Sequence, residues 1–191
     1  MFARDLLKKP APAPSPSLLP APVTHVHSLV GVASSTSLET AQAFIAKIKA
    51  PSTCVPHGSY ESLLASPGVD IVYIATPHSH HFQNVMAALH HGKHVLCEKP
   101  LAVSAAQATK LFAVAKAKKR FLMEGLWTRF LPAGLAVRQL IRDGTIGTIT
   151  RVFADNSLGM DLKQDFSTSD RMVVPCLAGG ALMDCMLPPC I

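Results

Sequence analysis

The spacing of apolar residues changes repeatedly between residues 25 and 157. Short β-branched runs, typical of strands, alternate with segments whose apolar residues recur every three or four positions, typical of helices. Strands are predicted at residues 26–33, 69–75, 94–97, 120–127 and 149–157, and helices at residues 37–49, 81–91 and 135–143, with another opening at the capping box of residues 104–107. This alternation predicts an α/β fold with a doubly wound parallel sheet.

Composition narrows the class of protein. The 191 residues are 49% hydrophobic and 16% charged, which excludes a chain disordered throughout and a coiled coil. No apolar run approaches the roughly 20 residues of a membrane span, and charges near the amino terminus exclude a signal peptide. Five cysteines without a C-x-x-C pair predict free thiols, so we expect a soluble cytoplasmic protein.

Two features outside the alternating pattern bear on partners. Residues 10–23 hold six of the fifteen prolines and predict an extended linker. The net charge of +6 is compatible with nucleic acid, but aromatic residues are few and the densest basic run, residues 116–120, lies at a predicted helix end. We therefore expect no nucleic-acid partner. The same charge suits an anionic cofactor such as a dinucleotide.

Open parallel sheets bind ligands at the carboxyl ends of their strands, so the residues there are the candidates for chemistry. Ser34 and Ser35 follow the first predicted strand, where an acidic residue would bond the ribose 2′-hydroxyl of NAD. Small hydroxyl side chains favour the 2′-phosphate of NADP instead. The alternative for Ser35 is a helix N-cap.

Three histidines follow the second predicted strand, in the run Thr76-Pro77-His78-Ser79-His80-His81. A metal site is one interpretation, with His57 or His94 as a further ligand. No carboxylate or cysteine stands at ligand spacing, so we predict no metal. A turn facing a phosphate or a nicotinamide is favoured, because amides at a helix start attract anions.

The next strand ends in Cys97-Glu98-Lys99-Pro100. Adjacent Glu and Lys residues usually form a solvated pair that contributes little to stability. At the carboxyl end of a strand, however, a positioned ammonium could polarise a carbonyl or bond a substrate hydroxyl. Lys99 is therefore a candidate catalytic residue.

These motifs together resemble the Gfo/Idh/MocA oxidoreductase family, nearest its dihydrodiol dehydrogenase and NADP-dependent D-xylose 1-dehydrogenase branch. The resemblance rests on Ala75-Thr76-Pro77-His78-x-x-His81, on His94-Val95-Leu96-Cys97-Glu98-Lys99-Pro100, and on Met123-Glu124-x-x-Trp127-x-Arg129-Phe130. It covers about residues 25–184. A further motif, residues 179–184, resembles part of the family's second domain.

The resemblance implies a Rossmann domain followed by a substrate domain whose open sheet also carries the homodimer contacts of full-length members. It implies hydride transfer between NADP and a small-molecule secondary alcohol, such as D-xylose or an aromatic trans-dihydrodiol. Lys99 matches the family's catalytic lysine, and Asp184 matches the residue that helps hold substrate. The positions that match residues lining the cofactor are Thr76, His78, His81, Glu98, Trp127 and Arg129.

The chain also departs from the family pattern. It holds no G-x-G-x-x-G, and residues 1–7 resemble the middle of the helix that follows that loop, so we expect an incomplete Rossmann-type sheet without a central strand. Beyond Asp184, Pro188 occupies the position of a residue that shares the acid/base work. We therefore expect an enzyme fragment truncated at both ends, or alternatively a non-catalytic interaction module or an inactive gene-model fragment.

These departures set the expected domain organisation. Residues 1–24 are a helix remnant with the proline-rich linker, residues 25–148 an incomplete dinucleotide-binding domain, and residues 149–191 the truncated start of an α+β substrate and dimerisation domain.

Overall fold

The computed structural model describes residues 4, 6, 7, 27–155, 159, 161, 164–180 and 183. The chain divides into two compact units, residues 1–70 and 71–191. The predicted linker and Asp184 lie outside the described residues, as does most of the predicted helix remnant. The predicted domain boundaries stay predictions.

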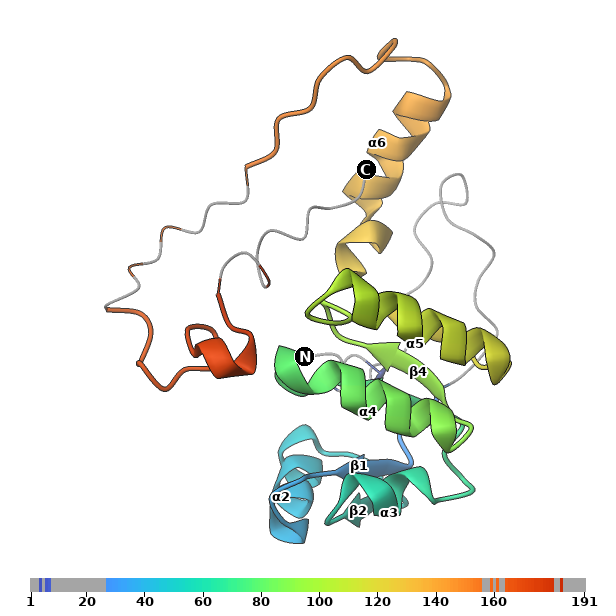
Figure 1. The fold of residues 1–191 in the computed structure, drawn as a ribbon, viewed down its shortest axis with the longest axis vertical. Coiled ribbons are helices and arrows are strands. Elements are labelled where there is room, and N and C mark those ends of the chain that lie inside the picture. Colours follow the sequence, from blue (N-terminus) through green and yellow to red (C-terminus); the bar gives the residue numbers. More distant parts are fainter. Residues whose placement is uncertain are drawn as a thin grey trace. The chain divides into compact units, whose positions relative to one another are not determined.

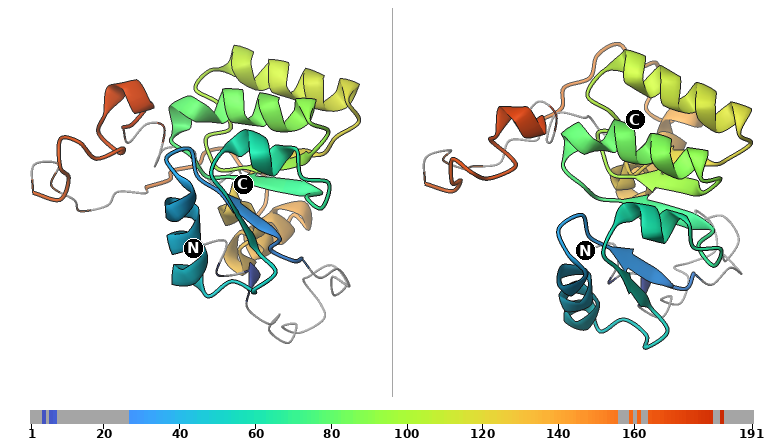
Figure 2. Two further views of the ribbon diagram at one scale, coloured as in Figure 1. Left: turned by 90° about the horizontal axis from the view of Figure 1, so that it is seen from below. Right: turned by 60° about the horizontal axis from the view of Figure 1, so that its bottom comes forward.

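The first unit holds two parallel strands, β1 (Gly31–Ala33) and β2 (Val55–His57), with Gly31 opposite Val55. They are joined by α2 (Leu38–Ile48), which contacts both strands, and β2 is followed by α3 (Tyr60–Leu64). Figure 2 shows this strand–helix–strand arrangement from two further sides. Its buried apolar residues are Ala41, Ile48, Cys54, Leu63, Leu64 and Val69.

The second unit contains a three-stranded parallel sheet in the order β3 (Ile71–Ile74), β4 (His94–Cys97) and β5 (Leu122–Glu124). Helix α4 (His78–His90) joins the first two strands and α5 (Ala105–Ala117) the last two. Right-handed crossovers that advance in one direction place both helices on the same face. They pack side by side there (Figure 1).

The core of this unit lies between the sheet and the two helices. Val95 and Cys97 of β4 are fully buried, while the alternate residues His94 and Leu96 are only half-buried. Val85 and Leu89 of α4 and Leu111 of α5 are also fully buried, as the spacing of apolar residues in these helices requires. The parallel strands and covering helices confirm the predicted Rossmann-type class, here with two separate sheets.

Beyond β5 the chain forms the short 3-10 helix η1 (Trp127–Phe130), then α6 (Pro132–Arg142), and later the 3-10 helix η2 (Pro175–Leu177). The strand predicted at residues 149–157 is wrong over residues 149–155, which have no regular structure. Phe153 is 86% exposed there. A strand without a partner cannot satisfy its backbone groups in a ladder. No described helix is long and apolar enough to cross a membrane.

Candidate active site at the carboxyl edge of the second sheet

The turn formed by residues 98–101 follows β4 at the carboxyl edge of the sheet. The backbone N–H of Glu98 donates to the carbonyl oxygen of Ile74 at 2.9 Å, which carries the β3–β4 pairing into the turn. The Lys99–Pro100 peptide bond is cis. Lys99 is half-buried and Pro100 is buried. The candidate lysine therefore stands where parallel sheets place ligand chemistry, as predicted.

The Glu98 carboxylate connects β3 to this turn. Its Oε1 accepts a hydrogen bond from the Tyr73 hydroxyl, and its Oε2 accepts one from the backbone N–H of Lys99 at 3.2 Å. Burial raises the pKa of Tyr73, and the hydrogen bond to Glu98 and that residue's charge raise it further. Glu98 is thus part of the backbone support of Lys99.

Glu124, the last residue of β5, holds the other side of the turn. Its Oε1 accepts a hydrogen bond from the backbone N–H of Leu101 at 2.8 Å. The next residue, Gly125, donates its N–H to the Cys97 carbonyl oxygen at 2.6 Å. A Cβ at Gly125 would lie only 3.2 Å from that oxygen, so glycine allows this close approach.

His81 bridges the two loops at this edge. Its ring is fully buried, with Nδ1 2.6 Å from the Pro100 carbonyl oxygen and Nε2 2.9 Å from that of Thr76. A neutral ring donates to one of these oxygens and a protonated ring to both. Burial nevertheless lowers the pKa of His81, because it disfavours the charged form more than the two carbonyls favour it.

His78 connects the start of α4 to residues much later in the chain. Its ring is 6% exposed, and its Nδ1 lies 2.9 Å from the Ala178 carbonyl oxygen. Because a carbonyl only accepts, Nδ1 donates in this bond. The His78 and His81 rings meet edge to face with centroids 5.7 Å apart. The contact brings η2, which precedes the motif of Asp184, to the amino end of α4.

Replacing His78 with alanine is expected to release the η2 segment from α4. The variant loses the hydrogen bond to Ala178, so amide hydrogen exchange in residues 171–180 should accelerate by about tenfold, with β4 unaffected. Mass-spectrometric hydrogen exchange measures both. His91→Ala is the matched control, because the His91 ring is exposed and bonds the Ala87 carbonyl of its own helix. Equal exchange in the two variants would contradict the role of His78.

The other predicted cofactor residues lie around this edge with different exposures. Thr76 accepts a hydrogen bond on Oγ1 from the Asn84 side chain at 3.1 Å, and no side chain caps the amino end of α4. Trp127 is 60% exposed at the start of η1, and Arg129 is exposed in the same short helix. Their contacts with a cofactor stay predictions.

Ser34 and Ser35 belong to the first unit, directly after β1. The Ser34 hydroxyl lies 2.8 Å from that of Thr36 and also accepts the Thr36 backbone N–H at 3.1 Å. The N-cap of α2 is Ser37, whose side chain accepts from the Thr40 N–H at 3.2 Å. The alternative that Ser35 caps this helix is therefore wrong.

The metal alternative gains no support from the histidine geometry. Over the residues that the structure describes, no three His, Cys, Asp or Glu side chains gather as ligands. Both ring nitrogens of His81 face carbonyls, and Nδ1 of His94 accepts the Phe121 backbone N–H at 2.8 Å. These ring nitrogens of His81 and His94 therefore form hydrogen bonds with backbone groups and are not directed at a shared metal position.

Sequence reasoning did not identify the side chains that anchor the turn, Tyr73 and Glu124. For each of them the sequence contains a feature that could have indicated this role. Tyr73 is the one polar-tipped side chain in an otherwise aliphatic strand, and a half-buried hydroxyl needs a partner. Glu124 ends β5, at the same edge as Glu98, where an acceptor can reach the amides of a neighbouring turn.

Comparisons with known proteins agree with this geometry. Residues 18–126 match the GFO_IDH_MocA family model, described as an oxidoreductase family with an NAD-binding Rossmann fold. The chain is 49% identical over 187 residues to D-xylose 1-dehydrogenase (NADP(+)) of Hypocrea jecorina, covering 96% of this chain and 46% of that protein. It is 40% identical over 158 residues to human trans-1,2-dihydrobenzene-1,2-diol dehydrogenase, covering 83% and 44%. The chain thus spans about half the length of the curated relatives it matches.

Solved structures give the same picture. An NAD binding oxidoreductase from Klebsiella pneumoniae superposes with a TM-score of 0.60 at 33% identity, covering 65% of this chain and 32% of that one. KijD10, a 3-ketoreductase from Actinomadura kijaniata in complex with NADP, superposes with a TM-score of 0.57 at 33% identity, covering 64% and 37%. The strand-end motifs, the parallel βαβ units and these matches together show that the chain belongs to the Gfo/Idh/MocA oxidoreductase family.

Proposed function

We propose that this chain is the cofactor-binding part of an NADP-dependent dehydrogenase that transfers hydride between NADP and a secondary alcohol. The alcohol is D-xylose or an aromatic trans-dihydrodiol, the substrates named for its relatives. Three cysteines lie in the described part of the chain, Cys54, Cys97 and Cys176, and all three are free thiols, which suits a cytoplasmic location. Two findings support this proposal: the D-xylose 1-dehydrogenase (NADP(+)) that the chain matches over about half of that protein's length, and the similar solved structure of KijD10 in complex with NADP.

The observation that carries the proposal is the support of the Lys99 turn. Hydrogen bonds from β3, α4 and β5 hold residues 98–101 at the carboxyl edge of the sheet. Because its backbone is fixed on both sides, the Lys99 side chain can bond the reacting oxygen of an alcohol. Its neutral amine accepts the hydroxyl proton when the alcohol is oxidised, and its ammonium returns that proton in the reverse reaction. NADP, when bound, supplies or accepts the hydride. Asp184 is proposed to hold the substrate.

The residues present fit a phosphorylated dinucleotide. No acidic residue stands between Ala33 and Ser37, where a carboxylate would repel a 2′-phosphate, and the Ser34 and Ser35 hydroxyls are proposed to bind it. The amino end of α4 is not capped by a side chain, which leaves its amides suited to an anionic or carbonyl group. The proposed contacts near the nicotinamide are Thr76, His78, His81, Glu98, Trp127 and Arg129.

Titration with NADPH tests the proposal directly. Trp127 is the single tryptophan of the chain, so its emission reports a nicotinamide bound beside it. We expect quenching of Trp127 with sensitised nicotinamide emission, at lower concentrations of NADPH than of NADH because the 2′-phosphate is favoured. A Trp127 spectrum unchanged at millimolar NADPH would reject cofactor binding by this chain.

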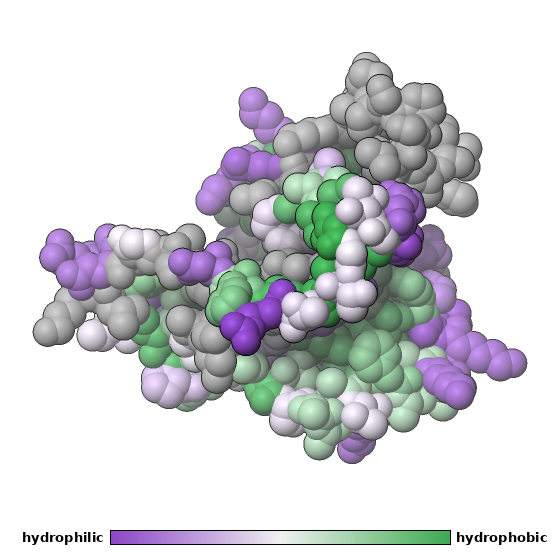
Figure 3. Space-filling model, turned by 90° about the horizontal axis from the view of Figure 1, so that it is seen from above, coloured by the Kyte–Doolittle hydropathy of each residue, from purple (hydrophilic) through white to green (hydrophobic). Residues whose placement is uncertain are grey.

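A non-catalytic interaction module is the second candidate, favoured by exposed apolar side chains after η1. No residue of α6 is buried, and Val137 and Leu140 are each about 40% exposed. Hydrophobic residues are visible at the surface of one face in Figure 3. Such surfaces promote association. Light scattering that shows a monomer across the concentration range, with little hydrophobic-dye binding, would reject this candidate.

A further inference from the structure

Tyr73 contributes the one side-chain hydroxyl of β3 and directs it at the active-site edge. It stands opposite Leu96 in the β3–β4 pairing, yet its hydroxyl reaches Glu98, two residues further along the chain from Leu96. The Tyr73 side chain is half-buried. The Tyr73 hydroxyl thus donates a hydrogen bond to one oxygen of the Glu98 carboxylate, and the other oxygen accepts a hydrogen bond from the Lys99 backbone N–H.

This arrangement makes the orientation of Glu98 depend on a neighbouring strand. A glutamate side chain has three rotatable bonds, and one backbone hydrogen bond leaves much of that freedom. The Tyr73 hydroxyl fixes the second oxygen, and hydrogen bonds to a charged acceptor are stronger than those between neutral groups. Each carboxylate oxygen keeps a further lone pair that can accept from a ligand hydroxyl or amide.

We propose that Tyr73 is a positioning residue for NADP, acting through Glu98: its hydroxyl fixes the carboxylate in the orientation in which Glu98 accepts a hydrogen bond from the cofactor. The inference rests on the proposed function, and it assigns a role to a residue that does not touch the cofactor. Two independent measurements test it.

The first measurement detects the Tyr73–Glu98 bond without any cofactor. The chain has two tyrosines, so Tyr60→Phe leaves Tyr73 as the only phenol, and ultraviolet absorbance then titrates it alone. Burial raises its pKa, with Glu98 and Cys97 of the neighbouring strand adding to the shift. We expect Glu98→Gln in this background to lower the phenol pKa, because the carboxylate's hydrogen bond and charge are gone. An unchanged titration would overturn the proposal.

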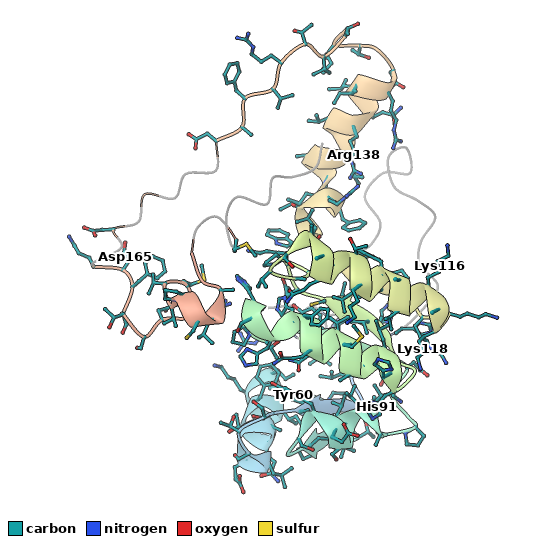
Figure 4. The ribbon with its side chains drawn as sticks, viewed as in Figure 1. Tyr60, His91, Lys116, Lys118, Arg138 and Asp165 are labelled. Atoms are coloured by element: carbon teal, nitrogen blue, oxygen red, sulfur yellow. The ribbon has the colours of Figure 1, made fainter. Side chains whose placement is uncertain are left out.

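The second measurement is NADPH affinity followed by Trp127 emission. Tyr73→Phe removes only the hydroxyl, and we expect about tenfold weaker NADPH binding, in the range of a lost hydrogen bond to a charged group. Tyr60→Phe is the matched control, since Tyr60 lies at the start of α3 in the first unit (Figure 4), and it should bind NADPH as the unmodified chain does.

A double-mutant cycle separates positioning from a general loss of stability. Tyr73→Phe should have no further effect on NADPH affinity once Glu98→Gln is present, because the hydroxyl acts through the carboxylate. Additive effects, or an affinity of Tyr73→Phe equal to that of the unmodified chain, would overturn the inference. Failure of the unmodified chain to bind NADPH would reject the proposed function instead, and the phenol titration would then decide whether the Tyr73–Glu98 pair exists.

Discussion

Methionine in place of Lys99 is expected to lower the rate of hydride transfer by about 10²- to 10⁴-fold, the range typical for loss of a general acid or base. Methionine keeps an unbranched side chain but has no amino group, so the reacting oxygen loses the ammonium that donates a hydrogen bond to it and the amine that accepts its proton. The Tyr73, His81 and Glu124 contacts involve other residues of the turn and should remain. NADPH affinity should therefore change little.

Reduction of NADP⁺ with D-xylose, and separately with an aromatic trans-dihydrodiol, measures this rate by nicotinamide absorbance. Lys118→Met is the control with the same charge change, since Lys118 caps α5, far along that helix from the turn (Figure 4). It should leave the rate within a factor of two of the unmodified chain, roughly the effect of a surface change. Turnover by Lys99→Met at the rate of the control would remove Lys99 from the mechanism.

The alternation between strand-like and helix-like spacing of apolar residues predicted most strands and helices of the second unit. Residues 94–97 form β4 as predicted, and Ser104 caps α5 by accepting the Gln107 N–H at 3.3 Å. These elements are compact in sequence, with their apolar pattern and their boundary signals within a few residues of one another. Local information was therefore sufficient for them.

Elements with conflicting local signals were missed or misplaced. Strand β2 was not predicted because it is three residues long and contains Pro56, a residue usually excluded from strand interiors. Helix α4 begins at His78, three residues earlier than predicted, because its first turn is polar and Pro77 serves as the cap. In α4 the helical spacing of apolar residues therefore begins later along the chain than the backbone hydrogen bonds of the helix do.

The location of the candidate site followed from the sequence, but its supporting contacts did not. The strand-end rule placed Glu98 and Lys99 at the ligand edge. The Tyr73–Glu98 bond joins residues 25 positions apart and ends on one carboxylate oxygen. The His81–Pro100 bond joins residues 19 positions apart and ends on a backbone carbonyl. No periodicity or composition signal encodes such pairings, since they depend on where two loops meet in three dimensions.

Alanine in place of His81 is expected to destabilise the second unit by about 3–5 kcal/mol. Removal of the fully buried ring leaves a cavity, and the carbonyl of Thr76 or Pro100 that accepts from the neutral ring loses its donor at the same time. Urea unfolding followed by circular dichroism measures the loss. His91→Ala, at the exposed carboxyl end of α4 (Figure 4), should change the free energy of unfolding by less than about 0.5 kcal/mol.

The pH dependence of unfolding provides a separate signature of the same ring. Because burial lowers the pKa of His81 below 6.5 in the folded chain, the unfolded chain binds its proton first as the pH falls. His81 therefore favours folding fully above pH 6.5, and this contribution declines as the pH falls toward the folded pKa. The free energy of unfolding should decrease in that window by up to about 1.4 kcal/mol per pH unit more than in His81→Gln, whose amide does not titrate. Parallel curves for the two proteins would mean that folding does not shift the pKa of His81. A steeper loss of stability toward high pH than in His81→Gln would mean that the folded ring keeps its proton and donates to both carbonyls.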